Sequence, residues 1–298
     1  MSTERRNPRS VDIDLFPTER ILRIINAEDA LVATAVNAAV PQISKAVELA
    51  VEAIRGGGRV LYVGAGTSGR IAALDAAECP STFSTPPGWV EAVIAGGAKA
   101  LNHAVENAED DAAKAAVDMK TRKVCARDLI VGIAASGKTP YTCAALEYAR
   151  AKGARTVAIV AAEDSPMSKS VDVTIETLVG PEIVTGSTRM KAGTAQKLVL
   201  NMISTTTMIR LGMTYSNWMI NLTMANTKLR SRGVHMLREI LGVSLDEAHK
   251  LSESSGGKLK VAVVMGALGC SRKDAEQRLN EGKGNLRKVL GHLGSGRE

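Results

Sequence analysis

Five short apolar runs alternate with longer stretches along the middle of this 298-residue chain, at residues 60–63, 90–95, 129–134, 156–161 and 171–175. Each run is continuous rather than alternating with polar residues, which is typical of strands covered on both faces. The stretches between the runs have lengths that suit crossover helices. The sequence therefore predicts an α/β fold with a doubly wound parallel sheet.

Helical patterns precede and follow these runs. Apolar residues recur at helical spacing within residues 17–55, where Pro41 begins a helix that the glycines at 56–58 end. Residues 189–241 are predicted to be helical as well, with Met and Leu at helical spacings. Ser244 and Ser271 each lie three positions before an acidic residue, which predicts two further helix starts. We expect an N-terminal helical segment (1–45), an α/β domain (46–225) and a helical C-terminal appendage (226–298).

The composition limits the kind of ligand that the chain can recognise. Aromatic residues make up only 3% of the chain, so stacking platforms for single-stranded nucleic acid are nearly absent. The net charge is +7, but the basic residues are scattered, and nucleic acid is therefore not an expected partner. We expect recognition of a small ligand through hydrogen bonds and charge.

Cysteine spacing and the N-terminal sequence indicate the compartment. The four cysteines lie far apart and form no C-x-x-C pair, so neither a metal site nor a disulfide framework is expected. A reducing compartment is the default for such a chain. The polar N-terminus has no apolar segment, and no apolar run approaches the length of a membrane span. We expect a cytoplasmic protein that does not interact with membranes.

The first apolar run continues into residues 64–69, whose sequence Gly-Ala-Gly-Thr-Ser-Gly matches the pattern G-x-G-x-x-G. A dinucleotide site would also need an acidic residue at the end of the second strand, whereas Glu91 lies near the beginning of that run. Thr67 and Ser68 instead add hydroxyl donors, and the following helix offers free backbone N–H groups. We interpret this loop as a site for a phosphate monoester, with an ordinary tight turn as the alternative.

The third run leads into a second loop, at residues 132–139, that matches the P-loop pattern letter for letter. Its first glycine, Gly132, lies inside the apolar run, where a P-loop would already be turning. Nucleotide hydrolysis therefore stays an alternative, and we predict that Ser136, Lys138 and Thr139 bind the same phosphate as the first loop. Both loops would lie at the carboxyl ends of their strands, where ligands bind in open α/β sheets.

The two loops, together with residues 180–197, resemble sugar isomerase (SIS) domains and more narrowly the N-acetylmuramic acid 6-phosphate etherase family. The resemblance covers nearly the whole chain, and its most specific stretches are residues 64–70, 75–80, 103–110 and 180–197. It implies a flavodoxin-like SIS fold and a homodimer without a metal or other cofactor. It also implies a carbon–oxygen lyase that converts N-acetylmuramic acid 6-phosphate and water to N-acetylglucosamine 6-phosphate and D-lactate. The family's two catalytic glutamates correspond to Glu78 and Glu109.

The implied reaction suits two carboxyl groups. Ring opening exposes an aldehyde at C1, which makes the C2 hydrogen acidic and places the lactyl ether at C3 in the β position. A base removes the C2 proton, an acid protonates the departing lactyl oxygen, and water adds to the unsaturated aldehyde. We assign Glu78 to the lactyl oxygen and the water, and Glu109 to the second proton transfer. From spacing alone, both glutamates equally fit solvated surface carboxylates.

Other residues and functions stay open at this point. Glu182 lies where some sugar isomerases keep an acid/base, so we include it among the candidate substrate-binding residues. Arg189 and Lys191 are candidates for pairing with the lactyl carboxylate. An aldose–ketose isomerase and a non-catalytic sugar-phosphate sensor are the two competing functions on the same fold.

Overall fold

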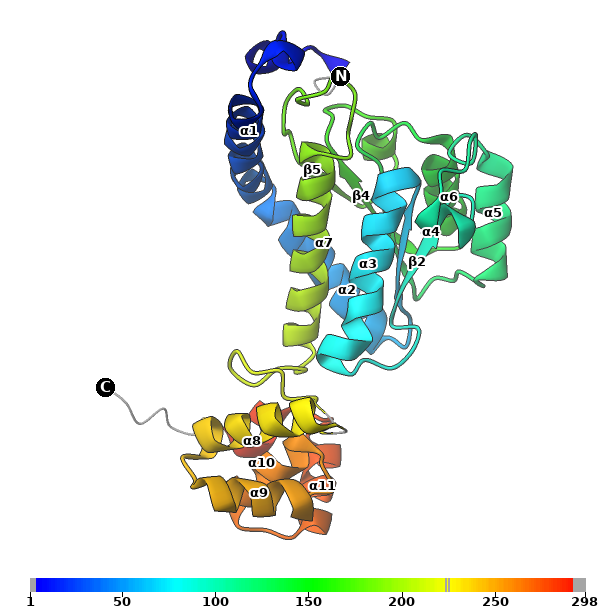
Figure 1. Ribbon diagram of the computed structural model, residues 1–298. Helices are drawn as coiled ribbons and strands as arrows, with labels where there is room; N and C mark the ends of the chain where they lie inside the picture. Colours follow the sequence, from blue (N-terminus) through cyan, green and yellow to red (C-terminus); the bar gives the residue numbers. More distant parts are fainter. Residues whose placement is uncertain (1–3, 223, 225, 292–298) are drawn as a thin grey trace. The chain divides into compact units, whose positions relative to one another are not determined.

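The computed structural model describes residues 4–222, 224 and 226–291. The chain divides into two compact units, each with its own hydrophobic core. Unit 1 comprises Met1–Glu78 and Pro87–Thr207, and unit 2 comprises Cys79–Pro86 and Met208–Glu298. Figure 1 shows that unit 1 contains the sheet and that unit 2 is helical. The three-segment division with boundaries at residues 45 and 225 stays a prediction.

Unit 1 is built on a five-stranded parallel sheet with the strand order β2-β1-β3-β4-β5. The strands are β1 (Val60–Gly64), β2 (Val90–Ile94), β3 (Leu129–Ile133), β4 (Arg155–Val160) and β5 (Val173–Glu176). All five predicted runs coincide with these strands to within two residues at each end, so the α/β prediction is confirmed. The order is that of flavodoxin-like folds.

Helices cover both faces of this sheet. The helices and short 3-10 turns that lie in unit 1, wholly or (α3 and α7) for most of their length, are η2 (Pro8–Ser10), η3 (Ile13–Leu15), α1 (Thr18–Ala38), α2 (Val40–Arg55), α3 (Gly66–Phe83), α4 (Lys99–Asn102), α5 (Ala112–Thr121), α6 (Pro140–Ala151), η4 (Met167–Lys169) and α7 (Lys191–Arg210). On one face, Leu61 and Ile130 share a core with Met119 of α5 and Leu146 of α6. Helices α2, α3 and α7 lie together on the other side of the sheet (Figure 1).

The predicted N-terminal helical region is divided between α1 and α2. Pro41 lies in the first turn of α2, and Gly56 is its C-cap, as the sequence predicts.

Among the described residues, no helix taken singly is long and apolar enough to span a membrane. Within the described part of the chain, one pair of helices, α1 and α2, meets that criterion of length and composition when taken together, and the pair is bent by 61° at its junction.

Asp75 links α3 to the sheet and to α7. Its buried carboxylate accepts hydrogen bonds from Tyr62 Oη at 3.1 Å, Asn201 Nδ2 at 2.6 Å and Ser204 Oγ at 3.0 Å. Burial raises the pKa of Asp75 more than these hydrogen bonds lower it. The contact fixes α3 one helical turn before Glu78.

The prediction that residues 189–241 are helical is wrong for the middle of the region. Helix α7 ends at Arg210, and α8 (Thr227–Leu241) begins after the N-cap Asn226. Between them, Gly212 has a φ of 79°, and Tyr215 and Trp218 form an isolated antiparallel bridge. A left-handed glycine ends a helix even where the neighbouring Met and Leu residues keep helical spacing.

Unit 2 is a helical domain arranged around its own core. After α8 follow α9 (Leu245–Ser254), α10 (Leu259–Leu268), α11 (Arg272–Glu281) and α12 (Leu286–Leu290). The two predicted helix starts are confirmed. Ser244 Oγ accepts from the backbone N–H of Glu247, whose carboxylate accepts from the backbone N–H of Ser244. Ser271 Oγ likewise accepts from the backbone N–H of Asp274 at 3.2 Å.

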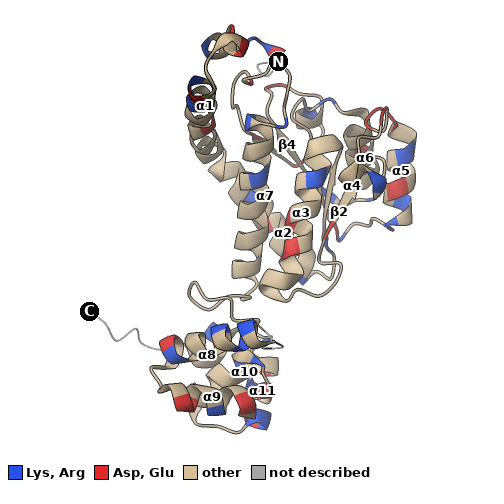
Figure 2. Cartoon of the chain, in the orientation of Figure 1, with Lys and Arg blue, Asp and Glu red and all other residues tan. Residues whose placement is uncertain are grey.

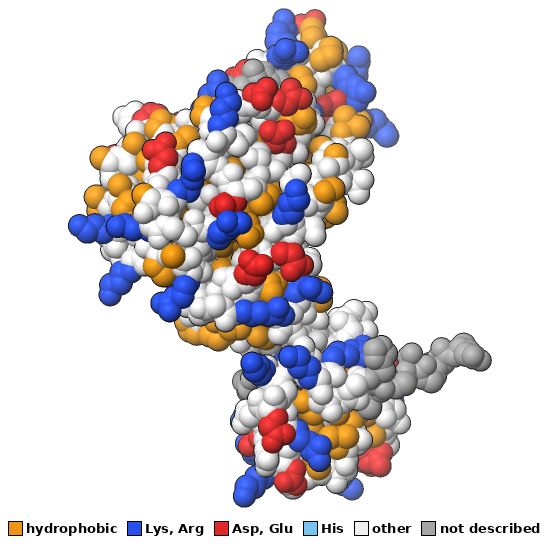
Figure 3. Space-filling model, turned by 180° about the vertical axis from the view of Figure 1, so that it is seen from behind, with side chains coloured by type: hydrophobic (Ala, Val, Ile, Leu, Met, Phe, Trp, Pro, Cys, Tyr) orange, Lys and Arg blue, Asp and Glu red, His pale blue; other side chains and the backbone are white. Residues whose placement is uncertain are grey.

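The charged side chains follow the scattered pattern that the sequence shows. On the face drawn in Figure 3, basic and acidic side chains are interspersed on each unit.

Lys260 of α10 gives unit 2 a predicted dependence on pH. Burial lowers the pKa of Lys260 to about 8, below the ordinary 10.5. Between these two values the unfolded chain binds more protons than the folded one, so the stability of unit 2 should rise with pH from about 8 to 10.5. Replacing the lysine (Lys260→Met) should remove this rise, which we expect to be about 1 kcal/mol after partial solvation. Trp218 fluorescence during urea unfolding, in a Trp89→Phe background, measures it.

Lys258→Met is the matched control, because Lys258 is exposed and pairs with Glu276 on the surface. A free-energy difference between wild type and Lys260→Met that stays constant from pH 7 to 10 would contradict the prediction.

Candidate functional site

The loops after β1 and β3 begin side by side at the carboxyl edge of the sheet. The two strands pair in parallel, and Gly64 at the end of β1 lies opposite Ile133 at the end of β3. Strand β2 lies on the far side of β1, so the order of the strands reverses between β1 and β3. Ligands of open α/β sheets bind outside the strand ends at this reversal point. The two predicted loops therefore flank the expected ligand position.

The first loop is short, and glycine is needed to form it. Helix α3 begins at Gly66, so Thr67 and Ser68 lie in its first turn, where backbone N–H groups have no partner within the helix. A Cβ at Gly69 would lie 2.5 Å from Ile94 Cγ1, which leaves no room for a larger residue between α3 and β2. The first turn of α3 thus lies close against the strand ends, with its N–H groups available to an anion.

The second loop contains residues 134–139, between the end of β3 and Pro140 at the start of α6. Gly132 lies inside β3, as the sequence predicts, and a Cβ there would lie 2.6 Å from Leu146 Cδ1 of α6. That glycine is required for close packing of the helix on the strand. The match to the P-loop pattern therefore depends on a packing residue, which disfavours nucleotide hydrolysis.

A pocket of about 440 Å³ lies against the second loop. Ser136 and Lys138 line it, together with Glu163 and Asp164 after β4 and with Arg5 of the N-terminal segment. Ser136 Oγ accepts from the backbone N–H of Lys138 at 3.2 Å, which orients the hydroxyl group within the loop. Two of the predicted phosphate-binding residues are thus brought together.

The other predicted phosphate-binding residues lie outside the lining of this pocket. Thr67 and Ser68 belong to the neighbouring first loop, and Thr139 is the N-cap of α6.

Glu109 lies beside the second loop. Its backbone carbonyl accepts from the N–H of Tyr141, in the first turn of α6, at 2.9 Å. Earlier in the same connection, Arg70 of α3 donates to the carbonyls of Ala100 and Leu101 and to that of His103 at 3.0 Å. The connection between β2 and α5 is therefore attached to α3 at one end and to α6 at the other. The side chain of Glu109 is exposed, and its backbone is attached to the start of α6, directly after the second loop.

Glu78 lies further from the loops along α3. Figure 2 shows a basic position near the start of this helix and acidic positions further along it. Glu78 is exposed and ten residues beyond Ser68, which corresponds to about 15 Å along the helix axis. Within one chain, Glu109 therefore lies close to one of the two candidate loops, whereas Glu78 lies far from Ser68 of the first loop.

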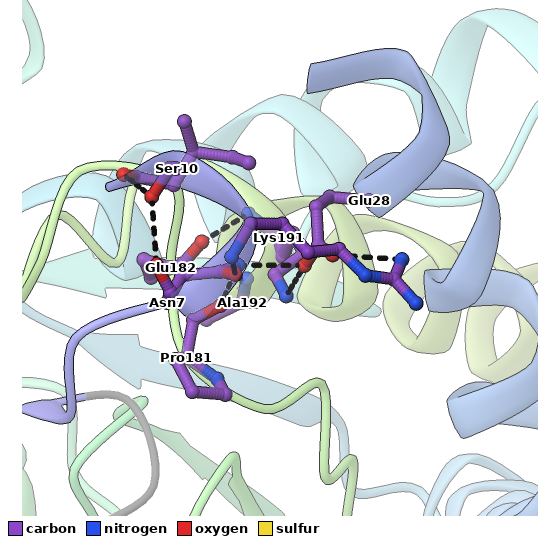
Figure 4. Close-up of polar contacts among 9 residues, drawn as sticks. Asn7, Ser10, Glu28, Pro181, Glu182, Lys191 and Ala192 are labelled. Carbon is purple, nitrogen blue, oxygen red and sulfur yellow. Dashed lines mark hydrogen bonds and ion pairs between the residues drawn. The ribbon is translucent and has the colours of Figure 1, made fainter. Parts of the chain in front are cut away.

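Glu182 is part of the structure around the start of α7. Its side chain is fully buried, and its two oxygens accept from the backbone N–H groups of Lys191 at 3.0 Å and Ala192 at 2.9 Å (Figure 4). A carboxylate in this position satisfies unpaired N–H groups and the positive end of the helix dipole. These contacts already occupy both oxygens of this predicted substrate-binding residue.

A buried ion pair lies next to this cap. Lys191 is 1% exposed, and its Nζ lies 2.6 Å from Glu28 Oε2 of α1 (Figure 4). Burial alone would raise the pKa of Glu28, but hydrogen bonds from Lys191 and Asn7 and the charges of Lys191 and Arg9 lower it overall. The suggested pairing of Lys191 with a substrate carboxylate is wrong, because the ammonium group is enclosed and already paired.

The apolar pattern of α1 contains one sequence signal of this ion pair. The buried residues of α1 are Glu28, Val32 and Val36, spaced four apart. A glutamate in line with an apolar stripe indicates a buried carboxylate, which must have a cationic or hydrogen-bonding partner.

Comparison with known proteins gives concordant matches. The model of the Glucokinase regulatory protein N-terminal SIS domain matches residues 42–150, and that of the SIS domain matches residues 102–206. An N-acetylmuramic acid 6-phosphate etherase from Jannaschia sp. is 51% identical over 88% of this chain and 83% of the relative. The etherase from Geobacillus thermodenitrificans is 45% identical over 97% of this chain and 98% of the relative.

The solved structures include a ligand-bound protein of E. coli CFT073, with a TM-score of 0.50 and 18% identity. The match covers 68% of this chain and 97% of that one. Together with the SIS domain match and the parallel sheet, it confirms the predicted SIS fold.

Removing the cation from the buried pair should destabilise unit 1. In Lys191→Met, Glu28 would stay buried with only Asn7 and Arg9 as partners, and we expect a loss of about 3–5 kcal/mol. Lys197→Met, at an exposed position of the same helix, should cost less than about 0.5 kcal/mol. Urea unfolding followed by the fluorescence of Trp89, in unit 1, measures both.

The double variant Glu28→Met/Lys191→Met tests the cause. Because no charge is left unpaired, it should be more stable than Lys191→Met alone. Equal stabilities of Lys191→Met and Lys197→Met would show that the pair contributes nothing.

Proposed function

Because the chain belongs to the N-acetylmuramic acid 6-phosphate etherase family, we propose that it cleaves the D-lactyl ether of N-acetylmuramic acid 6-phosphate with water. The products would be N-acetylglucosamine 6-phosphate and D-lactate. The observation that carries this proposal is the pair of serine-bearing loops at the reversal point of the sheet, in a chain that aligns with such etherases along 97% of its length. A carbon–oxygen lyase of this kind needs no metal for the steps below.

The phosphate group is bound between the two loops in this proposal. Thr67 and Ser68 supply hydroxyl groups at the N-terminus of α3, and Ser136, Lys138 and Thr139 supply two hydroxyl groups and a cation before α6. Both helix N-termini favour an anion. Glu182 acts here as a positioning residue, since it holds the first turn of α7 in place.

The carboxylates carry the proton transfers. After ring opening, one glutamate takes the C2 proton while the other gives a proton to the lactyl oxygen, so that the C3–O bond breaks and D-lactate leaves. Water then adds its hydroxyl to C3 and a proton returns to C2. We assign Glu78 to the lactyl oxygen and to the incoming water, and Glu109 to the second proton transfer. The position of Glu109 beside α6 supports contact with a sugar held at the second loop.

The position of Glu78 supports a homodimer. Five covalent bonds separate the phosphorus from C3 of the substrate, a span of at most roughly 7 Å at about 1.5 Å a bond. Ser68 and Glu78 of one α3 helix are about 15 Å apart along its axis. We therefore propose a site in which the loops of one copy hold the phosphate and Glu78 of a second copy reaches C3.

Two other functions remain distinguishable from this one. An isomerase on the same fold would move the carbonyl group and release no lactate. A sugar-phosphate sensor fits the match to the Glucokinase regulatory protein domain, but that match covers residues 42–150 only. We place the enzyme in the cytoplasm, in recovery or catabolism of cell-wall amino sugars.

Replacing Glu78 by glutamine should stop the reaction without loss of binding. We expect Glu78→Gln to lower D-lactate release from N-acetylmuramic acid 6-phosphate by a factor of about 10²–10⁴, because an amide cannot exchange the proton. A coupled assay for D-lactate measures turnover, and calorimetric binding of N-acetylglucosamine 6-phosphate should change less than about threefold. Glu106→Gln, at an exposed acidic position nearby, serves as the control. Near-normal lactate release by Glu78→Gln would remove this residue from the mechanism.

Mixing two inactive variants tests whether the site is shared between copies. Glu78→Gln and Ser136→Ala should each be nearly inactive at low substrate concentration. In a mixed dimer, one of the two sites would combine an intact second loop with an intact Glu78. Random subunit exchange should then restore about a quarter of the wild-type activity, since half of the dimers are mixed. If activity does not recover after verified subunit exchange, the second loop and Glu78 of one site must come from the same chain.

A further inference from the structure

Arg5 lies in the pocket beside the second loop, although it is far from that loop in the sequence. It lines the same pocket of about 440 Å³ as Ser136 and Lys138. Among the described residues, no hydrogen bond or ion pair engages its guanidinium group. The carboxylates of Glu163 and Asp164, on the pocket wall, are therefore not within ion-pair distance of it.

Contacts on both sides of Arg5 hold the N-terminal segment against residues 180–187. On one side, Asn7 is 5% exposed, and its Nδ2 donates to Glu28 Oε2 at 2.8 Å and to the carbonyl of Pro181 at 3.2 Å. On the other side, Glu4 lies close to Gly186, where an added Cβ would be 3.1 Å from Glu4 Oε2. The position of Arg5 is thus set by its neighbours on either side.

A third contact extends this anchoring. Ser10 Oγ donates to the carbonyl of Ile183 at 2.7 Å, and Figure 4 shows Asn7 beside Pro181. The backbone of residues 7–10 therefore follows the segment that leads into α7.

The chemistry of this position suits a phosphate group. A guanidinium group presents several N–H donors in a planar fork that matches phosphate oxygens. The neighbouring Ser136 hydroxyl and the Lys138 ammonium are donors of the same kind in the same pocket. A dianion at Ser136 would bring opposite charge to a guanidinium group that has no other partner in the described chain.

We propose that Arg5 binds the phosphate of the substrate, and that the buried contacts of Asn7, Glu28 and Lys191 hold the N-terminal segment in place for this purpose. The proposal rests on the proposed function, because it assigns a further residue to the same sugar-phosphate site. It makes the first ten residues of the chain part of the binding machinery and gives a function to an ion pair that otherwise only stabilises the fold.

Calorimetric binding of N-acetylglucosamine 6-phosphate tests the proposal directly, because this sugar carries the phosphate but no lactyl carboxylate. Arg5→Ala should raise its Kd about 10- to 100-fold, the range expected for loss of a charged hydrogen bond. The Kd of Arg5→Lys should lie between those of the wild type and Arg5→Ala, since lysine keeps the positive charge but not the planar set of N–H donors. With N-acetylmuramic acid 6-phosphate, KM should rise by a similar factor while kcat changes less than about threefold.

Arg6→Ala is the matched control, since Arg6 is exposed, adjacent in sequence and outside the pocket lining. Its Kd should equal that of the wild type, and all three variants should keep the wild-type unfolding midpoint. Unchanged binding by Arg5→Ala would overturn the proposal. So would a loss confined to N-acetylmuramic acid 6-phosphate, which would place Arg5 at the lactyl carboxylate instead. If the wild type bound neither sugar phosphate, the proposed function itself would fail.

Discussion

The parallel pairing of β1 with β3 is the constraint on which the rest of the site depends. Parallel strands end at the same edge, so Gly64 and Ile133 stand opposite each other and both loops begin there. The reversal of strand order at this point keeps the two following helices on opposite faces of the sheet, which leaves space between the loops. An antiparallel partner would have placed one of the loops at the far edge. The phosphate binding that we propose for the two loops would therefore depend first on the direction of the strands and only then on the side chains.

A second constraint comes from the polar contacts at the start of α7. Glu182 caps the helix, and Lys191 in its first turn is enclosed against Glu28. Burying an ion pair is costly, and such pairs are seldom the most stable solution for a core. This ion pair fixes position, because Glu28 of α1 contacts Asn7 and Arg9 of the N-terminal segment as well as Lys191 of α7. The contacts that hold Arg5 therefore belong to a part of the fold that cannot shift without leaving a charge unpaired.

The strands and several helix caps could be predicted because their signals are local. Continuous apolar runs, Pro41 at a helix start, and Ser244 three residues before a glutamate each carry their information within a few positions. The helix predicted through Gly212 failed because apolar spacing does not report a left-handed turn. The pair of Glu28 and Lys191 joins residues 163 positions apart, and no local pattern specifies that distance. The roles of Glu78 and Glu109 came from family resemblance alone, since their spacing also fits surface carboxylates.

The fold explains binding better than it explains the reaction. The chain has a SIS fold, and one fold can host different reactions, so the fold cannot decide between moving a carbonyl group and expelling a lactyl group. The decision depends on carboxylates outside the loops. Isomerisation needs proton transfer at C1 and C2, whereas ether cleavage also needs an acid at C3. Glu109 accepts a backbone hydrogen bond from Tyr141 at the start of α6, and we propose that it acts on a sugar held at the second loop. Glu78 lies about 15 Å along α3 from Ser68 of the same chain, and we propose that the Glu78 of a second copy reaches the sugar. In the proposed dimer, two carboxylates from different copies would reach the sugar, which would fit an elimination in which the C2 proton and the C3 substituent leave in separate directions.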